Sequence, residues 1–317
     1  MHFPKTALEF EERFNDEAAC EEYLFTLRWP NGFVCPKCGH EGGWRLRSRP
    51  RLIECSGCHA QTSLTAGTAF HGTRKPLRAW FKAMFLMATQ KTGTSAMNVR
   101  RQVGLNYETA WTWLHKLRAA LSSDHRTRLR GCVETDEGFI GGEEPGVPGR
   151  GSKKKALVSV AVEVREKRLG RARMTVIPDA SQATLTPLVT GNVELASEVH
   201  TDGWAGYDKL DEHGVRHRVH KGKERGKAAA KRLPHVHLVI SLLQRFLLGT
   251  YQGAVQARHL QSYLNEFVFR FNRRGCRFAT GIFERLARAV ARVPTDSRAT
   301  YASIVKLRHA TPLRVAA

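Results

Sequence analysis

Hydrophobic positions divide the chain into a helical part and a strand-rich part. Over Phe10–Leu27 they recur near the spacing of one helix face, which predicts a short amphipathic helix. The stretch LRAWFKAMFLMATQ is apolar on most faces and predicts a buried helix. The next segment, SAMNVRRQVGLNYETAWTWLHKLRAAL, predicts two helices separated by a turn at Gly104, with Asn106 capping the second. This is helix-turn-helix spacing.

From Cys132 onward, runs of β-branched residues replace the helical pattern. CVETDEGFIGG, ALVSVAVEVRE and ARMTVIPDA predict three consecutive strands. A helix at residues 182–193, the strand SEVHTD, a short helix at 207–212 and the strand VRHRVH follow. After a basic loop come helices at Pro234–Leu248 and Arg258–Phe271. The order β-β-β-α-β-α-β-α predicts an α/β fold with a mixed sheet flanked by helices, the RNase H-like arrangement.

These patterns divide the 317 residues into four segments. Residues 1–72 hold a cysteine module with its leading helix, and 73–125 form a helical, helix-turn-helix-like segment. Residues 130–275 are the predicted RNase H-like domain, and 276–317 a helical tail. A chain of this length can bury two modest cores.

Four of the seven cysteines form two CxxC pairs separated by 16 residues, Cys35/Cys38 and Cys55/Cys58. Two such knuckles at strand ends complete a tetrahedral thiolate site, so the spacing predicts a zinc ribbon. The rival interpretation, a redox pair, needs only one CxxC near a βαβ pattern. Because thiolates fill all four positions, the zinc is expected to be structural. The neighbouring His40 and His59 are expected to be exposed and not ligands.

The amino-acid composition predicts a polyanionic partner. Lys and Arg total 51 against 29 Asp and Glu, a formal charge of +22. Such an excess favours nucleic acid, since neutralised phosphates release counterions; a merely soluble basic protein is the plainer alternative. No export signal or membrane-spanning stretch is apparent, and the cysteines do not form a secreted disulfide framework. The expected compartment is the reducing cytosol.

Two carboxylates close short β-branched runs, Asp136 in VETDEGFIGG and Asp202 in VHTDGWAGY. An aspartate before glycine is commonly only a turn residue. Here both come directly off buried strands, where an unpaired charge is costly and a cation removes that cost. Mg²⁺ takes carboxylate oxygens, and two ions about 3.5–4 Å apart stabilise both the attacking and the leaving oxygen of phosphoryl transfer. The combination predicts chemistry that cuts or joins nucleic acid.

Three further residues lie close to this acid pair in the pattern. Glu134 is on the same strand face as Asp136 and is expected to support the metal ligands, whereas Glu137 points to the other face and is expected to be structural. His237 begins the helix after the fifth strand, 35 residues beyond Asp202. A histidine there is more often a core or surface residue than a ligand, so on spacing alone both interpretations stand.

The candidate DNA contacts lie in a basic run, in the helix-turn-helix segment and at Gln244, seven residues after His237 on the same helix face. Eight Lys or Arg occur from 216 to 232 against one acid; such a run is usually a solvated face, but beside a carboxylate site it is expected to follow a DNA backbone. The arginines and lysines of the helix-turn-helix segment are expected to contact phosphates. The alternative is a pair of packed helices without DNA contact. Trp111, Trp113 and Leu114 are expected to lie in the core. The candidates are Arg100, Arg101, Lys116, Arg118, Lys221, Lys223, Arg225 and Gln244.

The residues resemble a known family over roughly residues 10–275. LRWPNGFVCPKCGH, ECSGCHAQTSLTAGTAFHGTR, VETDEGFIGG, VHTDGWAGY and GTYQGAVQARHLQSYLNEFVFRFNRR are together similar to bacterial insertion-sequence transposases that join an N-terminal zinc ribbon to a DDE-type RNase H-like domain. The resemblance implies that Asp136 and Asp202 are the first two catalytic acids. The third, usually Glu, falls on His237, and the basic residue often found seven positions later falls on Gln244. Histidine neutralises less charge than a carboxylate and favours Mn²⁺ over Mg²⁺. Glu266 is the fallback third acid.

The resemblance further implies a DNA transposase that binds terminal inverted repeats and catalyses metal-dependent strand cleavage and strand transfer. Its implied cofactors are structural Zn²⁺ and catalytic Mg²⁺ or Mn²⁺, and its implied partners are the double-stranded DNA of element ends and target. Because both ends are cut together, a homo-oligomer is expected, located in the bacterial cytoplasm at the nucleoid. The alternatives are a catalytically degraded or repurposed zinc-ribbon DNA-binding protein and a structure-specific nuclease on the same fold.

Overall fold

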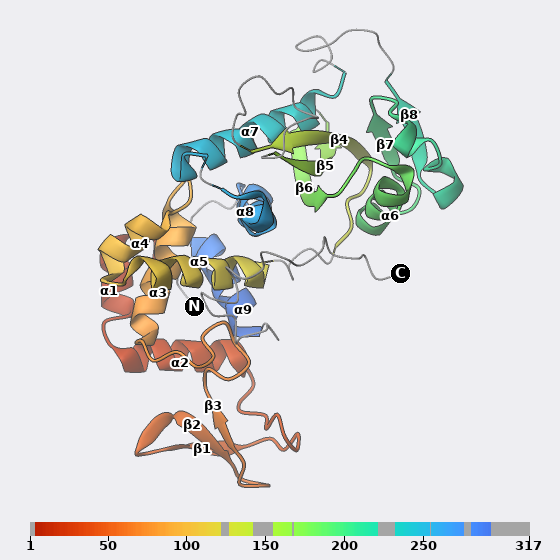
Figure 1. Ribbon diagram of the computed structural model, residues 1–317. Coiled ribbons are helices and arrows are strands. Elements are labelled where there is room, and N and C mark those ends of the chain that lie inside the picture. Colours follow the sequence, from red (N-terminus) through yellow and green to blue (C-terminus); the bar gives the residue numbers. More distant parts are fainter. Residues whose placement is uncertain are drawn as a thin grey trace. The chain divides into compact units, whose positions relative to one another are not determined.

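A computed structural model describes residues 4–121, 127–141, 155–166, 168–220, 232–253, 255–275 and 280–292 (Figure 1). Contacts among these residues form two compact units. The first contains the cysteine module, the helices up to residue 121 and a helix from the C-terminal segment, and the second contains the larger sheet with its helices. Across the described ranges, no helix is long and apolar enough to cross a membrane.

The helices of the first unit pack around an aromatic core. Trp80 and Trp113 stack with ring centroids 3.8 Å apart, and Phe14, Phe81 and Phe283 meet edge to face or stacked. Phe283 belongs to the last helix, so the C-terminal segment contributes to the same core as the N-terminal helices. The helices are α1 (Ala7–Arg13), α2 (Glu17–Arg28), α3 (Leu77–Thr89), α4 (Ala96–Val103), α5 (Tyr107–Leu121) and α9 (Thr280–Arg292).

The helices predicted for residues 73–125 are confirmed, and the helix predicted before them needs a correction. Helix α3 is buried along most of its length, and α4 and α5 flank a turn in which Gly104 has φ 74°. Asn106 caps α5 by accepting a hydrogen bond from the Thr109 N–H at 2.7 Å. The single helix predicted over Phe10–Leu27 is wrong, because α1 ends at Arg13 and the Asp16 side chain caps α2 by accepting from the Ala19 N–H at 2.7 Å.

The cysteine module is a small antiparallel sheet beside α2. Its strands are β1 (Gly43–Leu46), β2 (Arg49–Cys55) and β3 (Gln61–Ser63), in that order. Arg51 on β2 donates to Glu21 on α2 at 2.7 Å, and Arg45 on β1 pairs with Glu22 at 2.9 Å. These ion pairs attach the small sheet to the helix before it.

The second unit is built on a five-stranded mixed sheet of order β6-β5-β4-β7-β8. The first three strands along the chain are antiparallel to one another, whereas β7 is parallel to β4 and β8 is parallel to β7. This strand order confirms the RNase H-like mixed sheet. The strands are β4 (Cys132–Ile140), β5 (Ala156–Arg165), β6 (Arg168–Ile177), β7 (Glu198–Thr201) and β8 (Arg216–Val219).

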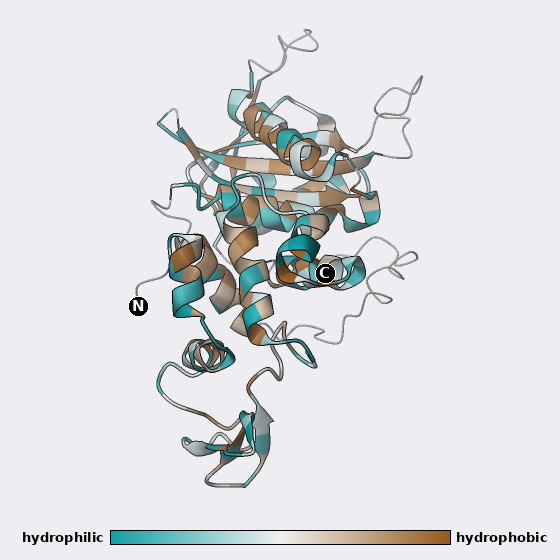
Figure 2. Ribbon diagram, turned by 90° about the vertical axis from the view of Figure 1, so that its left-hand side faces the viewer, coloured by the Kyte–Doolittle hydropathy of each residue, from teal (hydrophilic) through white to brown (hydrophobic). Residues whose placement is uncertain are grey.

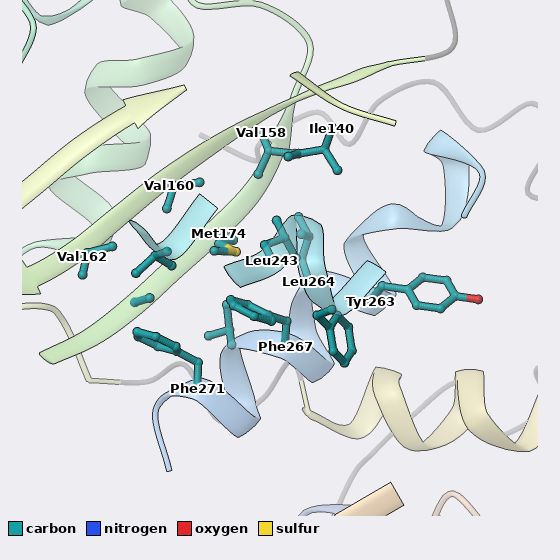
Figure 3. Close-up of a cluster of buried hydrophobic side chains, with 14 of the residues drawn as sticks. Ile140, Val158, Val160, Val162, Met174, Leu243, Tyr263, Leu264, Phe267 and Phe271 are labelled. Atoms are coloured by element: carbon teal, nitrogen blue, oxygen red, sulfur yellow. The ribbon is translucent and has the colours of Figure 1, made fainter. Parts of the chain in front are cut away.

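Helices cover both faces of this sheet, and apolar residues fill the strands and the helices packed on them (Figure 2). One face buries Val158, Val160 and Val162 of β5 against α7 (Pro234–Tyr251) and α8 (Leu260–Phe271) (Figure 3). The other face packs against α6 (Gln182–Asn192). The short helix predicted at 207–212 is instead two 3₁₀ turns, Ala205–Tyr207 and Asp211–His213.

Helix α8 also closes the outer edge of the sheet at β6. Asn272 accepts from the Ala172 N–H at 2.7 Å and donates to the Ala172 carbonyl at 3.2 Å. Gln261 makes the same two-way contact with Val176 N–H and the Met174 carbonyl. Since an open strand edge invites pairing with another chain, these side-chain amides satisfy β6 and protect it.

Candidate active site and cysteine cluster

Asp136 and His237 meet where β4 passes under the first turns of α7. Side chains alternate along β4, so Asp136 points to the face that α7 covers. The His237 Nε2 lies 3.5 Å from Asp136 Oδ2. Strand β7 is parallel to β4 with Glu134 opposite His200, and Asp202 follows directly after β7, close enough for its charge to act on the pKa of Asp136. The predicted residues Asp136 and His237 therefore meet over the middle of β4, and Asp202 follows the end of the neighbouring strand β7. The expectation that Asp136 ends its strand is wrong, because β4 continues to Ile140.

The electrostatics of Asp136 agree with this arrangement. Its pKa is raised from the ordinary 3.8 to about 6: burial is the largest cause and the Asp202 charge acts in the same direction, while the Glu137 N–H at 2.8 Å and His237 lower it. Asp202 is exposed and accepts a hydrogen bond from the Trp204 N–H at 3.0 Å. Two acids that repel each other beside a histidine form a donor set that fits a divalent cation.

The potential metal-binding atoms of Asp136, Asp202 and His237 are farther apart than the sulfurs of the four cysteines. In the described part of the chain, the four cysteines are the group of potential ligands whose donor atoms all lie within 4.8 Å of one another. Asp136, Asp202 and His237 come from β4, the end of β7 and α7, and their donor atoms do not meet that distance.

The raised pKa of Asp136 predicts that Asp136→Asn stabilises the second unit at neutral pH without added divalent cations. Because the fold raises the pKa, the stability linked to this group is fully present below pH 3.8 and lost as pH rises through about 6. The variant should gain about 3 kcal/mol in the free energy of unfolding at pH 7.5 and nothing at pH 3.5. Urea unfolding at the two pH values measures this. An equal gain at both pH values contradicts it.

The fallback acid Glu266 lies elsewhere. It is fully buried on α8, where it accepts a hydrogen bond from the Tyr251 hydroxyl at 3.3 Å. Tyr251 ends α7, 14 residues beyond His237, which is about 20 Å along a helix. The structure therefore brings His237, not Glu266, to Asp136. Gln244 is exposed on the same face of α7 as His237, two turns further on.

The candidate DNA contacts differ in their accessibility. Arg100 and Arg101 are exposed on α4, and Lys116 is half-buried on α5. Arg118, by contrast, is 1% exposed within the helical core, so its guanidinium is not accessible to a phosphate and it leaves the set of candidates. Of the basic run, Lys221, Lys223 and Arg225 lie outside the described residues.

The four cysteine sulfurs form the tight cluster of the first unit. Cys35 Sγ lies 3.7 Å from Cys58 Sγ, and Cys38 Sγ lies 3.7 Å from Cys55 Sγ. A tetrahedral ion with bonds of about 2.3 Å separates its sulfurs by about 3.8 Å, so the cluster fits zinc. His40 hydrogen-bonds to Ser56 and, like His59, is exposed.

Both knuckles have the same backbone geometry. The residue after each CxxC, Gly39 or His59, has a positive φ and donates its N–H to the carbonyl of the first cysteine, at 2.9 Å and 3.1 Å. Backbone N–H groups of Cys38 and Lys37 point at the Cys35 sulfur and lower the pKa of that thiol to about 6. Such an environment favours the thiolate, which is the form that binds metal.

Sequence reasoning did not identify two partners of the β4 acids. Glu134 contacts His235, and Glu137 accepts a hydrogen bond from the Tyr207 hydroxyl. The available signals were the proline that marks the first turn of α7, where backbone N–H groups need acceptors from outside the helix, and a tyrosine five residues after Asp202. Neither signal shows which acid is the partner, because Glu134 and His235, and likewise Glu137 and Tyr207, are far apart in the chain.

The second unit is an RNase H-like sheet with Asp136, Asp202 and His237 at its interior strands β4 and β7, and the first unit carries a cluster of four cysteines. The protein is therefore of the class that combines an RNase H-like fold with a four-cysteine ribbon. Comparison with known proteins agrees. The model of the ISXO2-like transposase domain matches residues 128–272, and that of the transposase zinc-ribbon domain matches residues 15–61. The chain belongs to the family of insertion-sequence transposases that join a zinc ribbon to a DDE-type domain.

Individual relatives are more distant. An uncharacterized protein in transposable element ISH50 of Halobacterium salinarum is 26% identical over 217 residues, which cover 63% of this chain and 71% of the relative. A pre-cleavage Mos1 transpososome has a TM-score of 0.28 at 10% identity, covering 64% of this chain and 76% of that one. The Mos1 strand transfer complex has a TM-score of 0.30 at 13% identity, covering 74% and 80%. Likeness at this level adds nothing to what the strand order shows.

Proposed function

We propose that the protein cleaves DNA at the ends of its insertion sequence and joins the freed ends to target DNA. The observation that carries this proposal is the position of His237, 3.5 Å from Asp136, with Asp202 following the end of the neighbouring strand β7. Membership of the transposase family supports the same reaction. The test is metal-dependent cleavage of a terminal-repeat duplex by the purified protein.

Asp136, Asp202 and His237 are proposed to hold Mg²⁺ or Mn²⁺. Bound there, the cation supplies charge neutralisation for phosphoryl transfer. Asp136 contributes a partly buried carboxylate, whose raised pKa shows that its negative charge lacks sufficient compensation, and Asp202 contributes an exposed carboxylate directly after the adjacent strand. The protein's own contribution is positioning and electrostatics, without a covalent intermediate.

The cysteine cluster is proposed to hold one structural zinc ion. Two observations support it: four sulfurs at tetrahedral spacing and a match to the transposase zinc-ribbon domain. Because thiolates take all four positions, this ion leaves no place for a reacting water and stabilises the ribbon. The ribbon and the α4–α5 pair are proposed to bind the terminal repeats.

The complete assembly is proposed to be at least a dimer on double-stranded DNA in the cytoplasm, at the nucleoid, because both ends of an element must be cut together. The net charge of +22 supports tight, salt-dependent binding to the phosphate backbone. Besides Arg100 and Arg101, the proposed contacts are Lys116, Gln244, Lys221, Lys223 and Arg225.

A double variant with Arg100 and Arg101 changed to alanine should bind terminal-repeat DNA less tightly. Each lost phosphate contact reduces the slope of log affinity against log salt by about 0.9, so the slope should fall by about 2. Fluorescence anisotropy at several salt concentrations measures it.

The matched control changes Arg285 and Arg288, two arginines on α9 in the same unit, and removes the same charge. Equal loss in both double variants would mean that charge alone, and not the α4 surface, drives binding. Asp136→Asn and Asp202→Asn should bind DNA at least as tightly as the unaltered protein, because they remove negative charge near the phosphates.

A further inference from the structure

The N-terminus of α7 is capped by a side chain from another element. Its own N-cap, Leu233, makes no side-chain hydrogen bond, and Pro234 occupies the first turn. Glu134 on β4 fills this role, because its Oε2 accepts from the N–H groups of His235 at 2.8 Å and Val236 at 2.9 Å. Its Oε1 lies 2.7 Å from His235 Nδ1. A carboxylate at a helix N-terminus interacts favourably with the helix dipole, and charged hydrogen bonds are strong.

This cap fixes how α7 lies along β4. Glu134 contacts the first turn, Asp136 faces His237, and a Cβ on Gly138 would lie 3.5 Å from Ile240. Alternate residues of β4, which share one face of the strand, therefore contact positions progressively further along α7. Sliding the helix by one residue would move His237 by about 1.5 Å. That shift is enough to misplace a metal ligand.

On the opposite face of β4, Glu137 holds the segment that follows Asp202. The hydroxyl of Tyr207, which is fully buried, donates to Glu137 Oε1. Between Asp202 and Tyr207 in the chain, Gly206 has no room for a side chain, because a Cβ there would lie 2.6 Å from the Ala180 carbonyl oxygen. Trp204 Nε1 donates to the same oxygen at 2.7 Å. The turn that begins at Asp202 is thus packed against the sheet and tied to β4.

We propose that Glu134 and Glu137 are positioning residues, which hold His237 and Asp202, respectively, opposite Asp136. The proposal rests on the proposed function, since it assigns these glutamates to the assembly of that metal site. Glu134 is 5% exposed and both its oxygens are engaged by α7, so it acts through the helix and is not itself a ligand. One strand segment, Glu134–Glu137, then supplies one ligand and the supports of the other two.

The test compares Glu134→Ala, Glu134→Gln and Tyr207→Phe in the full chain loaded with zinc. Supports behind metal ligands are typically worth about 10–100-fold in metal affinity or activity. Mn²⁺ affinity, measured by titration calorimetry, should fall by about that factor in Glu134→Ala and less in Glu134→Gln, which keeps an acceptor oxygen. Tyr207→Phe, which removes one hydroxyl, should also weaken Mn²⁺ binding. Hydrogen exchange over residues 233–243 should accelerate in both Glu134 variants but not in Tyr207→Phe.

The matched control is Glu163→Gln. Glu163 is also a fully buried glutamate of the sheet, held by Arg171 and the Arg130 N–H, so its loss should destabilise the second unit. It has no contact with α7 or Tyr207 among its hydrogen bonds, and Mn²⁺ affinity should stay unchanged. A purely structural role for Glu134 predicts equal Mn²⁺ affinity in Glu134→Gln and Glu163→Gln, and that result overturns the proposal.

The outcomes separate this inference from the proposed function. If the unaltered protein binds Mn²⁺ but cleaves no DNA, the proposed function fails while the positioning role is still decided by affinity and exchange. If it binds no Mn²⁺, the positioning of a metal site is overturned together with that site. Should Glu134→Ala not fold, Glu134→Gln and Tyr207→Phe give the same decision, because each retains most of the side chain's volume and packing.

Discussion

His237→Ala should lose nearly all cleavage of a terminal-repeat substrate while keeping its fold and its affinity for DNA. Supports behind metal ligands cost about 10–100-fold when removed, and His237 is proposed to contact the ion itself, so a loss of at least about 100-fold is expected. The side chain lies 3.5 Å from Asp136 and is about one-third exposed, so it is accessible to a cation without being part of the packed core. Single-turnover cleavage with Mg²⁺ and with Mn²⁺ measures the effect.

Two companion variants make this result specific. His237→Glu restores the carboxylate usual in the family and adds negative charge at the ion, so it should retain or raise activity with Mg²⁺. Glu266→Gln should cleave normally, because Glu266 is buried against Tyr251 at the far end of α7. Normal cleavage by His237→Ala together with a dead Glu266→Gln would show that the third ligand has been misassigned. If the unaltered protein does not cleave the substrate, the alternative is favoured, a DNA-binding protein without catalysis.

Cys55→Ser should abolish zinc binding and unfold the ribbon. The hydrophobic core of this module is limited to a few residues around Phe33 and Ile53, two of its buried members being the ligands Cys35 and Cys55 themselves. A core of this size supplies little stability, whereas structural zinc contributes about 10–16 kcal/mol of binding free energy in comparable small modules. Metal analysis should give about one zinc per unaltered chain and none in the variant.

Limited proteolysis reports the consequence for each unit. Cleavage within residues 33–63 should become fast in Cys55→Ser, while the RNase H-like unit still unfolds cooperatively. The matched control is Ser56→Ala, which changes the neighbouring residue and removes only a hydrogen bond to the exposed His40. Unaltered zinc content in Cys55→Ser, or a native disulfide between Cys35 and Cys38, would contradict the ribbon assignment.

Most of the helices and strands could be predicted from short-range sequence patterns. Strands β4 to β6 follow from alternating β-branched runs, and the turn between α4 and α5 follows from Gly104 and the Asn106 cap. The break between α1 and α2 was missed because continuous apolar spacing concealed the capping signal of Asp16, whose hydrogen bond to Ala19 starts a new helix. Where two local signals compete, spacing alone does not decide between them.

The sequence by itself identified the candidates for chemistry: two CxxC pairs, the aspartates Asp136 and Asp202, and a histidine after the fifth strand. Their identities and local spacings are sufficient for that, because metal preference depends on ligand type. Only the tertiary structure decided which of them meet. It placed His237 and not Glu266 at Asp136, buried Arg118 in a helical core completed by α9, and joined Glu134 and Glu137 to α7 and Tyr207. These contacts join residues far apart in the chain, and helix or strand periodicity contains no information about which distant surface a side chain will meet.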